Sequence, residues 1–226
     1  MFTWLQRRFD LPHYGNIPLL VSVFLCVLVH FSGALGMSFF DRDLFVAFTP
    51  LNLLLMFMLL IWNEPALTFP WYLGFAVALL TGIGSEMIGV NTGLLFGSYV
   101  YGDVLGTKIM GVPLLIGLNW FCIVYCSFIS VDMFFRNGRL GGIVTAMVAG
   151  LLATCFDWIM EPVAMKLGFW QWEGNSIPLF NYVSWWVIAS AVAYVFQRLH
   201  LKSKNQFAPI LLLVQALFFI ALRIFI

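Results

Sequence analysis

The chain has 226 residues, of which 62% are hydrophobic and 9% are charged. Water-soluble domains carry about 25% charged residues, so this composition excludes a soluble globular protein. The formal net charge of +1 also excludes a basic surface for nucleic acid. We therefore predict that residues 1–226 form a single integral membrane domain, with lipid as its solvent and no soluble domain attached.

Seven apolar runs approach the length that a helix needs to cross the hydrocarbon core of a bilayer. They cover residues 18–39, 44–62, 71–90, 112–130, 141–160, 178–196 and 207–225. The second run contains Pro50, so its helix either begins after the proline or is kinked there. The sequence thus predicts an all-α, polytopic membrane bundle of about seven transmembrane helices, without an internal repeat.

The positions of Lys and Arg orient the predicted bundle, because cytoplasmic loops carry an excess of both. The side that holds the N-terminus would carry Arg7, Arg8, Arg136, Arg139, Arg198, Lys202 and Lys204, against Arg42, Lys108, Lys166 and Arg223 on the other side. We therefore predict a multi-pass protein of the cell membrane with a cytoplasmic N-terminus. The first run follows two arginines as a signal peptide does, but its length favours a retained helix.

Four cysteines and one histidine fall inside the apolar runs. Cys26, Cys122, Cys126 and Cys155 show no CxxC or Cys/His spacing, so we interpret them as small buried side chains and expect neither disulfides nor a metal site. His30 lies near the middle of the first run. It is either a proton relay or, more commonly for a single histidine, a hydrogen-bonding partner of a neighbouring helix.

Three carboxylates lie where hydrocarbon would surround them. Glu86 is at the end of the third run, and Asp157 and Glu161 are at the end of the fifth, with no Lys or Arg in the interior of any run to pair with them. Residues four apart share a helix face, so Asp157 and Glu161 should not both be ionised, and one is expected to keep its proton. Pro162 follows directly and should bend or end the helix, freeing the carbonyl of Trp158 for water.

Small and aromatic residues surround these acids in the sequence. Gly89, Gly93 and Gly97 would share the face of Glu86 if the helix continued through Asn91 and Thr92, either to pack against another helix or to form a wall for a flat ligand. Tryptophans near the carboxylates form either an interfacial belt or part of a site. By the predicted topology, the loops after Glu86 and Glu161 emerge on the same side. One candidate site would then collect Tyr99, Tyr101, Asp157, Glu161, Gln171, Trp172, Asn181 and Trp185.

Two ordered blocks of sequence resemble the carotenoid biosynthesis membrane protein family, which includes carotenoid 1',2'-hydratases. The first block is GSEMIGVNTG at 84–93, followed by FGSYVY at 96–101 and GVP at 111–113. The second is ATCFD at 153–157, EPVA at 161–164, WQW at 170–172 and NYVSW at 181–185. The resemblance covers roughly the third through sixth predicted helices.

The resemblance implies addition of water across the terminal double bond of an acyclic carotenoid, giving a tertiary alcohol without a cofactor or a metal. We assign Asp157 as the acid and Glu86 and Glu161 as its catalytic companions, with roles that could be exchanged. The residues expected to bind substrate are Gly89, Asn91, Thr92, Gly93, Tyr99, Tyr101, Trp158, Trp170, Trp172, Asn181 and Trp185. The expected partners are a carotenoid drawn from the bilayer, membrane lipid and other carotenoid biosynthesis enzymes.

Two alternatives remain open on the sequence. A carotenoid end-group cyclase or isomerase would use the same acid but exclude water until a neighbouring double bond attacks. A proton-coupled transporter of a lipid-like molecule would also contain intramembrane carboxylates and broken helices. The missing inverted repeat and the placement of the acids toward one membrane face favour an enzyme.

Overall fold

The computed structural model describes residues 17–135, 141–201 and 203–226, and most of these residues are helical. The helices are α2 (Ile17–Phe39), α3 (Arg42–Ala47), α4 (Thr49–Trp62), α5 (Phe69–Thr92), α6 (Leu114–Phe134), α7 (Gly142–Lys166), α8 (Leu179–Arg198) and α9 (Phe207–Phe225). Apolar runs form helices in lipid because each backbone amide must find its partner inside the same segment. The predicted all-α membrane bundle is confirmed.

Six of the described helices are long and apolar enough to cross a membrane, and α4 is a shorter apolar helix of 14 residues. At 1.5 Å per residue α4 is about 21 Å long, less than the roughly 30 Å of hydrocarbon. The second predicted run is therefore divided into α3 and α4. Pro50 explains the break, because it lies in the first turn of α4, where its missing amide hydrogen costs nothing.

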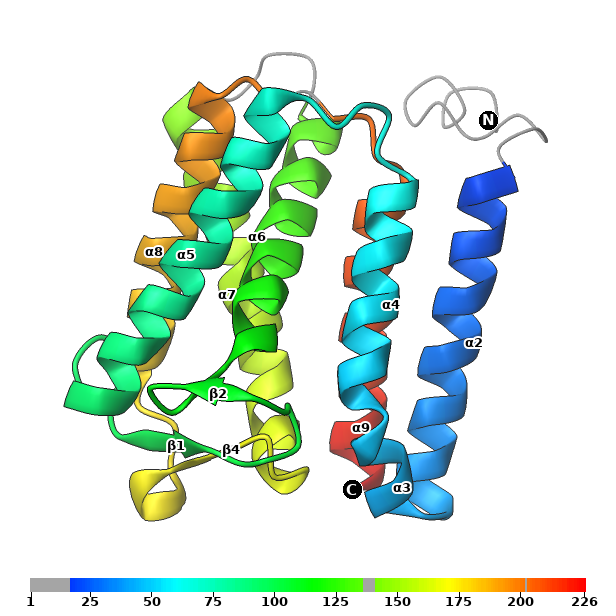
Figure 1. Ribbon diagram of the computed structural model, residues 1–226, viewed down its shortest axis with the longest axis vertical. Helices are drawn as coiled ribbons and strands as arrows, with labels where there is room; N and C mark the ends of the chain where they lie inside the picture. The colour runs from blue at the N-terminus through cyan, green and yellow to red at the C-terminus, as the bar shows by residue number, and fades with distance from the viewer. Residues whose placement is uncertain (1–16, 136–140, 202) are drawn as a thin grey trace.

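The helices pack in two groups (Figure 1). Helices α5, α6, α7 and α8 stand together, and α2, α4 and α9 stand beside them, with α6 and α7 both contacting α9. Helix α6 is the central element, since 72% of its most apolar 18-residue stretch is buried inside the protein. Many large apolar side chains on the outer helices are exposed, among them Phe24, Phe31 and Leu80, as expected of a surface that faces lipid.

Short strands close the lower end of the bundle in Figure 1. Strand β1 (Tyr99–Tyr101) pairs antiparallel with β4 (Trp170–Trp172), and β2 (Lys108–Ile109) pairs with β3 (Val112–Pro113). A 3-10 turn, η1 (Glu173–Asn175), follows β4. The β1–β4 ribbon joins the loop after α5 to the loop after α7, so the prediction that these loops emerge on the same side is confirmed.

Charged residues divide between the two ends of the bundle. Arg42, Lys108, Lys166 and Arg223 belong to elements at the end that holds the β1–β4 ribbon, whereas Arg198 and Lys204 lie at the opposite end. Five other basic residues that were used to predict the orientation lie outside the described residues: Arg7, Arg8, Arg136, Arg139 and Lys202. Among the cysteines, Cys155 is exposed on α7, whereas Cys26, Cys122 and Cys126 are buried as predicted.

Candidate active site

Three carboxylates from two helices meet inside the bundle, and we call Glu86, Asp157 and Glu161 the carboxylate cluster. Glu86 projects from α5, and Asp157 and Glu161 project from one face of α7. Their exposed fractions are 5%, 1% and 3%. Ionised carboxylates are rarely buried this deeply unless hydrogen-bond donors surround them, so the donors define the site.

Glu86 accepts hydrogen bonds from three aromatic side chains. The phenols of Tyr99 and Tyr101 both donate to its Oε2, Tyr101 at 2.7 Å, and Trp120 Nε1 donates to its Oε1 at 2.9 Å. Burial, together with the nearby Glu86 charge, raises the pKa of Tyr99 and of Tyr101 well above the usual phenol value. Both phenols therefore stay protonated and act as donors at neutral pH.

The second half of the cluster is held by tryptophans and one amide. Trp170 Nε1 and Trp172 Nε1 donate to Glu161 Oε2 at 2.8 and 2.9 Å. Asn181 Nδ2 lies 3.1 Å from Asp157 Oδ2 and 3.5 Å from Glu161 Oε1, so one amide bridges the two acids. Asn181 is positioned by the first turn of α8, which packs along α7.

The β1–β4 ribbon explains how donors from distant segments converge. Its register places Tyr99 opposite Trp172 and Tyr101 opposite Trp170. Alternate residues of a strand face the same side, so all four of these side chains point to the carboxylates. The intervening residues face away: Val100 is 63% exposed, and Gln171 is exposed and donates to Asn175 Oδ1 at 2.6 Å. The expectation that Gln171 belongs to the site is therefore wrong.

A small cavity of about 20 Å³ lies among the carboxylates. This is room for about one water molecule, because a buried water needs a cavity of roughly 10–15 Å³ and two to four polar partners. The cavity is lined by Glu86, Phe96, Tyr99, Tyr101, Ile116, Asn119, Trp120, Asp157, Met160, Glu161, Trp170, Trp172, Asn181 and Trp185. We call it the water-sized cavity.

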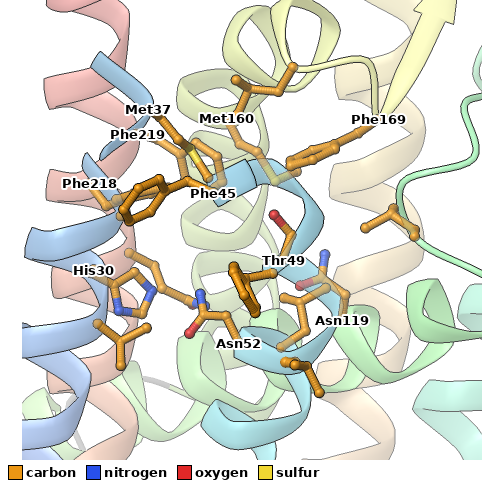
Figure 2. A pocket seen from close by; sticks show the side chains of 18 of the residues that line it. His30, Met37, Phe45, Thr49, Asn52, Asn119, Met160, Phe169, Phe218 and Phe219 are labelled. Carbon is orange, nitrogen blue, oxygen red and sulfur yellow. The ribbon is translucent and has the colours of Figure 1, made fainter. Parts of the chain in front are cut away.

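A second cavity of about 440 Å³ adjoins the first, and Figure 2 shows side chains that line it. Its walls come from α2, α3, α4, α6, α7 and α9, and they are mostly aliphatic and aromatic. Ile116, Asn119, Met160 and Trp170 line both cavities, so they form the boundary between them. We call this larger space the apolar cavity; its volume lies within the range of about 300–1,000 Å³ usual for ligand sites.

The structure brings most of the predicted site residues together. Glu86, Asp157 and Glu161 meet with Tyr99, Tyr101, Trp170, Trp172, Asn181 and Trp185 around the water-sized cavity. Gly89 lies behind them and makes room: a Cβ there would be 2.7 Å from Phe96 and 2.9 Å from the Tyr99 hydroxyl. A larger residue at Gly89 would push Tyr99 away from Glu86.

Four predicted substrate-binding residues are not brought to the cavities. Helix α5 ends at Thr92, and Gly93 follows in the left-handed conformation with a φ of +69°, so the glycine stripe does not continue along one helix face. The exposed Asn91 side chain donates to the carbonyls of Met87 and Met110, and Thr92 is exposed. Trp158 is 55% exposed on the outside of α7.

The carbonyl of Trp158 has a partner that the sequence did not indicate. Helix α7 continues past Pro162 to Lys166, so of the two outcomes predicted at the proline, a bend or an end, the end of the helix is wrong. Pro162 has no amide hydrogen for the carbonyl four residues earlier. Arg223 Nη1 of α9 approaches that carbonyl at 3.5 Å, and its guanidinium lies 4.9 Å from the centre of the Trp158 ring. Arg223 therefore contacts the freed group.

Two residues of the site were missed by the sequence analysis. Trp120 donates to Glu86 and stacks on Trp185, with ring centroids 3.7 Å apart and planes 6° from parallel. Asn119 lies at the boundary of the two cavities. The available indication was a polar residue beside a tryptophan within an otherwise apolar helix. Within the described residues, no group of three or more His, Cys, Asp or Glu side chains is arranged to hold a metal ion.

The chain is similar in sequence to one curated protein and to one protein family. A curated protein from Haloarcula japonica, bisanhydrobacterioruberin hydratase, is 29% identical over 154 residues, which are 62% of this chain and 51% of that protein. The chain thus spans about half the length of this relative. No solved structure matches the present chain. The carotenoid biosynthesis protein family matches residues 45–226, which include the carboxylate cluster and all its hydrogen-bond donors, and the chain belongs to that family.

Proposed function

We propose that this chain adds water across the terminal 1',2' double bond of an acyclic carotenoid end group to give a tertiary alcohol. The observation that carries the proposal is the water-sized cavity, which is lined by three buried carboxylates and shares four lining residues with the larger apolar cavity. One space suits the reacting water and the other suits a hydrocarbon chain. The name of the Haloarcula relative supports the same reaction class.

Asp157 is the proposed proton donor. Donated hydrogen bonds stabilise an ionised carboxylate, and Glu86 accepts three and Glu161 two from strong aromatic donors. Asp157 accepts one, from the neutral Asn181 amide, among the contacts of the described residues. Of the three acids it is the one whose surroundings best suit the protonated form, with Glu86 and Glu161 as the ionised companions.

In the proposed reaction the Asp157 proton adds to the less substituted alkene carbon, and a tertiary cation forms at its neighbour. The faces of Trp172, Trp185 and Tyr99 stabilise this cation. The enclosed water then forms the new C–O bond and gives up a proton to Glu161 or Glu86. That proton returns to Asp157, so the sum is alkene plus water giving alcohol. The carotenoid reaches the site from the bilayer.

The proposal is tested by expressing the protein in cells that make acyclic carotenoids and analysing their pigments by chromatography and mass spectrometry. A mass gain of one water per modified end is expected, and Asp157→Asn, with its membrane level verified, should abolish it. A ring-containing isomer of unchanged mass would instead show cyclisation. Unaltered pigment with protein present in the membrane would count against hydration and favour the transporter.

We further propose that the N-terminus is cytoplasmic, in a protein of the cell membrane. The support is the sequence, which places seven Lys and Arg residues on the N-terminal side of the predicted bundle and four on the other side. Fusing a reporter that is active in the cytoplasm alone to the N-terminus, and then to the link between α2 and α3, tests this arrangement. Activity of the first fusion and inactivity of the second are expected, and the reverse would overturn the orientation.

A further inference from the structure

The apolar cavity has polar groups in its wall that hydrocarbon alone would not require. His30 projects into it from α2, and Asn52 and Thr49 project from α4 (Figure 2). Helix α2 lies before residue 45, where the match to the family begins. One wall of the cavity therefore comes from a segment that lies outside the residues matched by the family.

The hydrogen bonding of His30 fixes which of its ring nitrogens is free. Nδ1 lies 2.8 Å from the carbonyl oxygen of Cys26, one turn earlier on α2. A carbonyl can only accept, so Nδ1 carries the hydrogen and Nε2 of the neutral ring is an acceptor. The ring packs edge-on against Phe218 of α9, with centroids 5.4 Å apart, which holds its plane. His30 thus offers a fixed acceptor on the cavity wall.

Asn52 supplies the complementary groups. Its Oδ1 is buried and has no hydrogen-bond partner among the described residues. An amide carries both donors and an acceptor, and leaving a buried polar group unsatisfied costs about 1–3 kcal/mol. A hydroxyl group both donates and accepts, so it matches a histidine acceptor and an asparagine amide better than a purely donating or purely accepting group does.

The apolar cavity also borders the water-sized cavity at the carboxylate cluster, because Ile116, Asn119, Met160 and Trp170 line both. A ligand in it must therefore be apolar along its length and able to place one end at the boundary. We infer that the apolar cavity binds an isoprenoid chain that carries a hydroxyl group away from its reacting end, and that His30 and Asn52 recognise this hydroxyl. This inference rests on the proposed function for the identity of the reacting end.

Binding of two labelled ligands to the purified full chain in detergent tests the inference without requiring turnover. The probes are tritiated geranylgeraniol, an acyclic isoprenoid alcohol, and the hydrocarbon in which hydrogen replaces its hydroxyl. The wild-type chain should bind the alcohol at least about fivefold more tightly, the scale of one net hydrogen bond. His30→Leu and Asn52→Leu should each bring this ratio close to one while hydrocarbon binding persists, which also shows that the cavity is intact.

Gln197→Leu is the matched control, because it replaces an amide by leucine on α8, outside the residues that line either cavity. It should keep the wild-type ratio. Equal affinity of the wild-type chain for both probes, or a preference that survives both cavity variants, would overturn the inference. Preference for the alcohol in a protein that leaves carotenoids unchanged would support the hydroxyl site and refute hydration. Hydration without the preference would refute the hydroxyl site alone.

Discussion

Fully or partly buried carboxylates occur at the two ends of this bundle, and the two regions use them differently. Glu64, in the link between α4 and α5, accepts hydrogen bonds from the Tyr125 hydroxyl, Ser203 Oγ at 3.0 Å and Asn205 Nδ2 at 3.3 Å. These donors come from α6 and from the link between α8 and α9. Glu64 lines neither of the two cavities described above. It ties three segments together, whereas the carboxylate cluster at the other end adjoins room for water and a long apolar cavity.

The comparison shows that burial of an acid does not by itself identify a site. Glu64 is a single acid whose donors come from α6 and from the link between α8 and α9. The carboxylate cluster places three acids together, one of them with a single amide donor, beside space that no side chain fills. Two features make the carboxylate cluster, and not Glu64, the candidate for catalysis. One is the adjoining cavity, and the other is the unequal number of hydrogen-bond donors to its three acids.

The largest effect is expected from Asp157→Asn. It should lower hydration by about 100- to 10,000-fold, because the amide cannot transfer the proton on which the reaction depends. Glu64→Gln, the corresponding change at the other end of the bundle, should leave the rate within about twofold. Product formation per amount of membrane-inserted protein is the measurement. Equal losses in the two variants would remove the distinction between the regions.

Trp120→Phe is expected to slow the reaction by about 10- to 100-fold. The phenyl ring can still pack near Trp185, but Glu86 loses a donor, and a hydrogen bond to a charged group is worth about 1.5–3 kcal/mol. Trp71→Phe is a matched control, since Trp71 Nε1 is buried without a hydrogen-bond partner among the described residues. A rate unchanged in Trp120→Phe would show that this donor does not matter to the site.

Gly150→Ala should destabilise the protein by about 1–3 kcal/mol, the usual cost of overfilling a packed interface. A Cβ at Gly150 would lie 2.1 Å from Ser190 Oγ and 2.7 Å from its backbone nitrogen, so α7 and α8 would have to separate. Gly84→Ala is the control, because nothing lies within 4 Å of a Cβ there. Thermal unfolding in detergent should show a lower midpoint for Gly150→Ala and little change for the control.

The smallest effect should come from Glu64→Gln, which is expected to change the unfolding midpoint by an amount that depends on pH. Burial, partly offset by the hydrogen bonds from Tyr125, Ser203 and Asn205, raises the pKa of Glu64 above its ordinary value. A group whose pKa is raised by folding contributes stability below its unfolded pKa and loses that contribution as the pH rises through its folded pKa. The unfolding midpoint of the wild-type chain, relative to Glu64→Gln, should therefore fall from acid to neutral pH. A difference independent of pH would contradict the shift.

Hydropathy predicted most of the fold because lipid imposes one dominant requirement on each segment. The run at 207–225 coincides with α9, and the other long runs differ from their helices mainly at the ends. The fifth run was placed too short because Pro162 suggested an end. Helix α7 tolerates the proline, since the carbonyl that it frees is contacted by Arg223 from a helix that lies 65 positions away in sequence.

The candidate site was predictable as far as its acids and the convergence of two loops. Which side chains of those loops point inward depended on the pairing of three-residue strands, and such short strands have no recognisable pattern of their own. Trp158 seemed part of the site from its position next to Asp157, but adjacent residues on a helix point in different directions. The apolar cavity is formed by helices from both ends of the sequence, and no local pattern records that packing.

The packing of α2 bears on the order in which the protein is assembled. Helix α2 packs more extensively on α9 than on any other helix, and His30 meets Phe218 there. Synthesis delivers α2 to the membrane first and α9 after every helix between them. Until α9 arrives, the inner face of α2 has lipid or another protein as its neighbour. The apolar cavity is therefore completed late in biosynthesis. A chain that stalls before α9 would form a membrane bundle that contains the carboxylate cluster but lacks the α9 side of this cavity.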